Sequence, residues 1–167
     1  SRSLVKEIWK SKEPVPSLRV SGLTTTSLGA MRDYLTGEQF YRRLEWDSAQ
    51  AAFQRAIDQD STFAMAHYRL AMALGWKGGY QLPQANQASA AALRFSGKLP
   101  PRERSLVAIY KLFSDRELAS VDSAKAYVAA NPEDVDGWYM LGEAQYHTRE
   151  RTGVDAVTIE NSFEKVV

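Results

Sequence analysis

A small residue recurs at nearly constant spacing along this chain, in segments that otherwise have helical periodicity. Gly37, Ala71, Ala108 and Gly142 each lie among large apolar or aromatic residues, and the gaps between them are 34, 37 and 34 residues. Gly inside a helix costs about 1 kcal/mol relative to Ala, so its use there needs a packing reason. We expect that a second helix approaches closely at each of these positions. The spacing predicts a structural repeat of about 34 residues.

The apolar periodicity predicts eight helices arranged in four consecutive pairs, with no alternating β pattern between them. Pro83 and Pro101 suit the first turn of a helix, and Asn131-Pro132 ends one. The expected helices cover 28–43, 47–60, 61–76, 82–96, 101–114, a segment that ends near 128–132, 133–149 and 158–167.

Residues 1–26 differ in character from the helical region. They are polar and contain two prolines, so we expect an N-terminal extension and linker with at most a short helix at LVKEIW. The domain then covers residues 27–167. We interpret TTTS, residues 24–27, as the N-cap of the first domain helix, because hydroxyl side chains accept from free helix N–H groups, with a phosphorylation site as the alternative.

Two helices per 34 residues, with small and aromatic residues in register, resemble the tetratricopeptide repeat family. Its pattern is W-x2-L-G-x2-Y…A-x3-F…P. The matching residues are Gly37, Phe40, Ala49, Phe53 and Ala56 in the first repeat, Leu70, Ala71 and Leu74 in the second, Ala108 and Pro132 in the third, and Trp138, Leu141 and Gly142 in the fourth. The resemblance implies an all-α, right-handed superhelical solenoid of about four helix-turn-helix repeats, covering 28–60, 61–97, 100–132 and 133–167.

A closer similarity concerns residues 22–115. LTTTSLGAMRDYLTGEQFYRR and STFAMAHYRLAMALGW resemble the repeat region attached to bacterial serine/threonine protein kinases and multidomain regulators. The sequence has no kinase signature: no Gly-rich loop with a catalytic Lys, no His-Arg-Asp loop and no Asp-Phe-Gly. The similarity implies the non-catalytic part of a larger bacterial protein.

Composition excludes several functional classes. The formal net charge is +1, which argues against a nucleic-acid partner held by bulk charge. The chain has no cysteine, so disulfides and thiolate chemistry are excluded. No apolar run approaches the ~20 residues that span a bilayer, so we expect no direct membrane insertion. The compartment is unknown from the sequence, with the cytoplasm favoured.

The candidate chemical groups do not form a catalytic or metal-binding pattern. His67 and His147 are in no HExxH or H-x3-H arrangement, and we interpret both as polar positions of the groove or surface. Glu38 and Glu143 each follow a small residue but lie three repeats apart, too far to share one substrate. PPRERS, residues 100–105, reads as a solvated helix start, with a phosphate or partner contact as the alternative. We therefore predict no enzyme, no cofactor and no metal site.

In this architecture the first helix of each pair lines a concave groove, and the side chains projected onto it are mostly aromatic. Aromatics and Met suit peptide recognition, because they bury area at low entropy cost. The alternative is that they only pack between neighbouring repeats. The predicted groove residues are Tyr34, Glu38, Tyr41, Tyr68, Met72, Trp76, Tyr139, Glu143 and Tyr146, with Arg42 and His147 beside them.

The functional prediction is a non-catalytic protein–protein interaction module that binds a peptide or a partner domain in this groove. Tyr34, Glu38 and Arg69 occupy positions where chaperone-binding members hold a terminal carboxylate with Lys and Asn, which argues against that activity. Two alternatives are a ligand-sensing regulatory region of a larger kinase or regulator, and a structural self-assembly spacer.

The C-terminal end suggests a homo-oligomer. NSFEKVV forms a short second helix after a stretched loop at 147–157, and Phe163, Val166 and Val167 are apolar. Terminal repeats need a polar outer face, so we expect either self-association through this end or a disordered last turn, with Phe163 or Val166 pointing inward.

Overall fold

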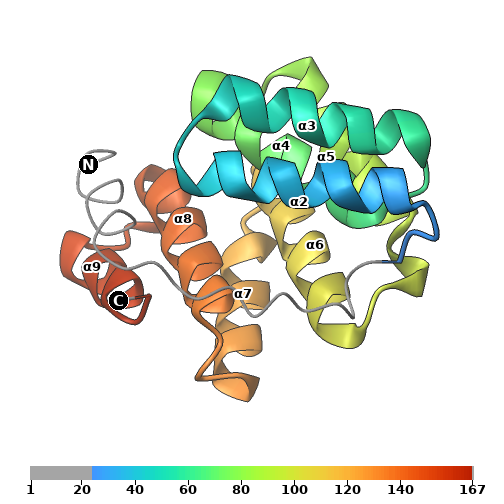
Figure 1. The fold of residues 1–167 in the computed structure, drawn as a ribbon. Helices are drawn as coiled ribbons and strands as arrows, with labels where there is room; N and C mark the ends of the chain where they lie inside the picture. The colour runs from blue at the N-terminus through green and yellow to red at the C-terminus, as the bar shows by residue number, and fades with distance from the viewer. Residues whose placement is uncertain (1–23, 167) are drawn as a thin grey trace. The chain divides into compact units, whose positions relative to one another are not determined.

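A computed structural model describes residues 24–166 of the chain, and this part is all-α, with eight α-helices, no strand and 78% of residues helical (Figure 1). The described residues fall into two compact units, 24–115 and 116–166. The first contains α2 (Leu28–Arg42), α3 (Trp46–Gln59), α4 (Ala64–Gly78), α5 (Pro83–Arg94) and α6 (Pro101–Ser114), with a short 3-10 helix at Ser96–Lys98. The second contains α7 (Ala119–Ala130), α8 (Val135–Thr152) and α9 (Ala156–Glu164).

The eight expected helices are therefore present, most of them with ends within two residues of the sequence prediction. One prediction was wrong: residues 147–157 are not a stretched loop, because α8 continues to Thr152 and α9 begins at Ala156. Gly153, with φ of 69°, ends α8 in the left-handed conformation that glycine adopts easily. The short helix expected at LVKEIW, and the linker up to residue 23, lie outside the described residues.

Local side chains explain where several helices begin. The Ser27 hydroxyl accepts from the Ala30 N–H at 3.1 Å, which confirms TTTS as the N-cap of α2. Asp134 and Asp155 cap α8 and α9 by the same means. Pro83 and Pro101 occupy the first positions of α5 and α6.

In the unit of residues 24–115, each helix packs on the next along the chain, and Figure 1 shows α2 and α3 side by side. The close approach of α2 and α3 depends on Gly37. A Cβ atom at this position would lie 2.5 Å from the ring of Phe53, which is fully buried. The Tyr34 ring lies 5.7 Å from Phe53 and 5.0 Å from Phe63, so one aromatic cluster joins α2, α3 and the start of α4.

In the unit of residues 116–166, α8 packs against both α7 and α9. Two glycines of α8 make this possible. A Cβ at Gly137 would lie 2.6 Å from the Tyr127 ring of α7, and one at Gly142 would lie 2.7 Å from the Phe163 ring of α9. Phe163 thus points inward, as expected. The buried Ser162 hydroxyl donates to Gln145 Oε1 at 2.8 Å, which adds a polar link between α8 and α9.

Ala71 is fully buried, whereas Ala108 is partly exposed, so Ala108 is the least enclosed of the four recurring small residues. On α9, the polar residues Glu160, Asn161 and Glu164 are exposed. Val157 is a large apolar side chain on the same helix that is also exposed, at 63%. The outer side of this helix is thus mostly polar. Self-association through it stays a prediction.

We predict that Gly37→Leu lowers the free energy of unfolding by about 1–3 kcal/mol, because Phe53 has no space to move. Gly142→Leu should cost less, since Phe163 is partly exposed and can rotate. Gly97→Leu is the control, because nothing lies within 4 Å of its Cβ position. Urea unfolding of the three variants measures the order, and equal midpoints for Gly37→Leu and Gly97→Leu would contradict it.

Candidate interaction site on helices α2 and α4

The predicted groove residues fall into both units. Six of them come from two helices of the first unit, and these six are Tyr34, Glu38, Tyr41, Tyr68, Met72 and Trp76. The structure brings the α2 and α4 members together. The remaining three, Tyr139, Glu143 and Tyr146, are on α8 in the second unit.

Most of these side chains are buried. Tyr34, Tyr41, Tyr68 and Met72 are 7%, 2%, 4% and 3% exposed, so α2 and α4 already cover them. Glu38 and Trp76 are partly exposed. For the four buried residues, this burial favours the alternative role, which is packing between neighbouring helices.

Arg69 on α4 is the centre of the contacts between the two helices. Its Nε lies 2.8 Å from Glu38 Oε1, and its guanidinium carbon lies 5.5 Å from the Tyr41 ring and 5.7 Å from the Tyr68 ring. The guanidinium also hydrogen-bonds the Tyr34 side chain. One cation therefore meets a carboxylate, a phenol and two aromatic faces, an arrangement that suits the planar, multidonor guanidinium.

The two tyrosines of α2 are held as neutral phenols. Burial is the main cause that raises the pKa of Tyr34 and of Tyr41 well above the usual tyrosine range, and the Glu38 carboxylate also raises both. Arg69 acts in the opposite direction on each but does not cancel the effect. These hydroxyls therefore stay protonated at any physiological pH and do not serve as bases.

Trp46 is the site residue that sequence reasoning missed, because it was placed in a connection between two helices. It is the first residue of α3, and its ring stacks on that of Trp76 with centroids 5.8 Å apart and planes 3° from parallel. The Tyr41 ring meets Trp46 edge-on at 5.2 Å, and the Tyr41 side chain also lies against the Trp76 side chain. Both indoles are partly exposed. The signal in the sequence that could have identified this residue was a Trp placed just after the end of the first expected helix.

On α8, Tyr139 and Glu143 are buried, at 5% exposure each, and the Tyr139 ring lies 6.4 Å from Phe163. His147 lies one turn after Glu143, with Nε2 3.7 Å from its Oε2. Tyr146 is partly exposed, and the Arg149 guanidinium lies over its ring at 4.8 Å. The predicted groove residues on α8 therefore also have contacts within their own unit.

The groups considered for chemistry have structural partners. His67 Nε2 lies 2.9 Å from the Ser61 carbonyl oxygen, and its ring stacks on Phe95 at 5.8 Å. Arg104 of the PPRERS segment donates to the carbonyls of Gly97 and Leu99 at 3.1 and 2.9 Å. Across residues 24–166, no three His, Cys, Asp or Glu side chains are grouped so that they could hold a metal ion.

The geometry thus defines an all-α protein whose first two helix pairs are joined by an aromatic and ionic network. Comparison with protein-family models, with curated proteins and with solved structures found no match. Membership of the tetratricopeptide family therefore stays a prediction from the sequence pattern. None of the helices in the described part of the chain is long and apolar enough to cross a membrane.

Removing Arg69 should test the ionic network. We expect Arg69→Met to lower the free energy of unfolding by about 2–3 kcal/mol, because Glu38 would lose its cation in a largely enclosed position. The double variant Glu38→Leu/Arg69→Met should recover part of that loss. Arg55→Met is the control: it breaks a pair with Asp33 in which Arg55 is 52% exposed, and should cost under about 1 kcal/mol. If Arg69→Met and Arg55→Met unfold at the same urea concentration, the network does not stabilise the fold.

His67 should make stability depend on pH. Burial is the main cause that lowers the pKa of His67 below 6.5 in the folded chain. Between the folded and the unfolded pKa values, the unfolded chain therefore binds more protons than the folded chain. The free energy of unfolding should therefore fall as the pH is lowered through 6.5. NMR titration of the imidazole gives the folded pKa directly, and His67→Gln should remove this part of the pH dependence. A measured pKa above 6.5 would contradict the assignment.

Proposed function

We propose that this chain is a non-catalytic protein-interaction module, and that it binds a peptide segment of its partner at the Trp46–Trp76 pair. The observation that supports the proposal is the exposure of two stacked indoles at the edge of an otherwise filled helix interface. Tyr34, Tyr41 and Tyr68 are buried, and Tyr41 contacts both indoles.

The two stacked indoles offer a large and rigid apolar surface. Trp is enriched among the residues that dominate binding energy at protein interfaces, since it buries a large surface with few rotatable bonds. Here Tyr41 contacts both indoles, so little side-chain freedom remains to be lost on binding. Preorganisation of this kind raises affinity, because the cost of ordering the surface is already met in folding.

The turn between α2 and α3 fixes the position of Trp46. The Glu45 N–H donates to the Phe40 carbonyl at 3.0 Å and the Leu44 N–H donates to the Tyr41 carbonyl at 3.1 Å. Leu44 has φ of 61°, so the two bonds close a Schellman motif with a leucine at the left-handed position. Trp46 then begins α3 immediately after the motif. Gln50, one turn further along α3, donates to the Ala73 carbonyl of α4 at 3.2 Å and ties the two helices together.

A displayed library of random dodecapeptides, panned on the folded chain, tests this function. We expect enriched peptides whose binding weakens about tenfold or more in Trp46→Leu and in Trp76→Leu, as truncated aromatic anchors generally do. Trp138→Leu is the matched control, a partly exposed indole in the other unit. Circular dichroism checks that each variant folds. Failure to enrich any peptide that depends on the two indoles would reject the proposed site.

A further inference from the structure

We infer that the partner segment is acidic, and that it places carboxylate side chains on Arg42 and Arg43 while an apolar ring of the segment packs on the Trp46–Trp76 pair. This inference rests on the proposed function and specifies the chemistry of the partner at the same site.

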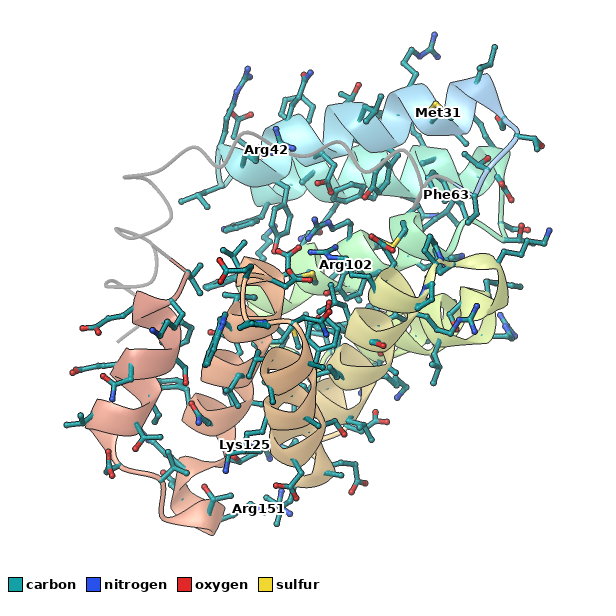
Figure 2. The ribbon with its side chains drawn as sticks, turned by 90° about the horizontal axis from the view of Figure 1, so that it is seen from below. Met31, Arg42, Phe63, Arg102, Lys125 and Arg151 are labelled. Carbon is teal, nitrogen blue, oxygen red and sulfur yellow. The ribbon has the colours of Figure 1, made fainter. Side chains whose placement is uncertain are left out.

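The register of α2 and α4 places Arg42 at the Trp76 end of the interface. Tyr34 meets Phe63, Glu38 meets Arg69 and Tyr41 meets Trp76, so the contacts advance in the same direction along both helices. Figure 2 agrees, since Phe63 lies toward the Met31 end of α2 and away from Arg42. Arg42 follows Glu38 by one turn, so it is on the same face of α2 and at the end of that helix from which the chain continues to Trp46.

The cations in this region are available to a ligand. Arg42 and Arg43 are exposed, and among the described residues neither takes part in an ion pair. The other charges of the region include Lys77, which pairs with Asp47, and Glu45, which lies between Arg43 and Trp46 in sequence. The region therefore keeps an excess of positive charge next to the aromatic pair.

The backbone fixes the positions from which the two arginine side chains project. Arg42 is the last residue of α2 and Arg43 is its C-cap, followed by the hydrogen-bonded turn at Leu44. Two adjacent guanidiniums on a fixed turn can each bind a carboxylate through paired N–H groups. An acidic segment complements that charge, whereas a basic one would be repelled.

Fluorescence titration of the enriched peptides, made with amidated C-termini, tests the inference. The amide ensures that side-chain carboxylates are the only acidic groups offered. We expect the enriched sequences to be rich in Asp and Glu beside Pro, Phe, Tyr or Trp, and their affinity to fall about tenfold in the double variant Arg42→Gln/Arg43→Gln. Arg32→Gln is the matched control, an exposed arginine without an ion pair at the other end of α2, and should change affinity less than about twofold.

A second measurement does not depend on the variants. Binding to the wild-type chain should weaken when salt is raised from 50 to 300 mM, because the proposed contacts are exposed charge pairs. Peptides that need the two indoles but show no excess of acid, no response to salt and no response to Arg42→Gln/Arg43→Gln would overturn the acidic partner and leave the interaction module standing. The absence of any peptide that depends on the indoles would overturn both.

Discussion

The packing of this protein depends on aromatic rings that lie directly on helical glycines. Phe53 covers Gly37, Phe163 covers Gly142 and Tyr127 covers Gly137, each at a separation that leaves no room for a methyl group. The absence of a side chain lets two helix backbones approach, and the flat ring fills the space between them. Each contact joins a helix to a neighbour in sequence, so the same solution is used within both units.

A second interaction joins successive helix pairs in the first unit. Arg69 reaches from α4 to Glu38, Tyr34 and Tyr41 of α2, and it pairs its charge where the surroundings are mostly aromatic. A partly enclosed ion pair adds little net stability compared with apolar packing, but it penalises any shift of the two helices that separates its members. The network therefore specifies the register of α2 against α4, and that register decides which side chains of the two helices remain exposed.

Much of the fold could be predicted from the sequence, because small residues, prolines and capping groups act locally. Ser27, Pro83 and Pro101 mark helix starts that the structure confirms. The stretched loop was wrong because HTRER carries no helix-breaking residue before Gly153, so local propensity continued the helix. The candidate site was harder to predict. Projection onto a helix face indicates which residues share a side, but it does not indicate that Arg69 and its neighbours already fill that side.

The filled interface changes where recognition can occur. If Tyr34, Tyr68 and Met72 lined an open groove, a ligand would find apolar surface along α4, but all three are buried. Tyr34 packs on Phe53 and Phe63, Tyr68 packs on Tyr110, and Met72 accepts from Arg69. Under the proposed function, the surface for a partner is therefore the partly exposed Trp46–Trp76 pair at the edge of this interface. Trp46 reaches that edge from α3 through a turn whose backbone bonds are satisfied internally, so the aromatic pair is exposed without loss of packing. The same ionic network that closes the interior thus leaves one end of the helix pairs as the surface that we propose for binding.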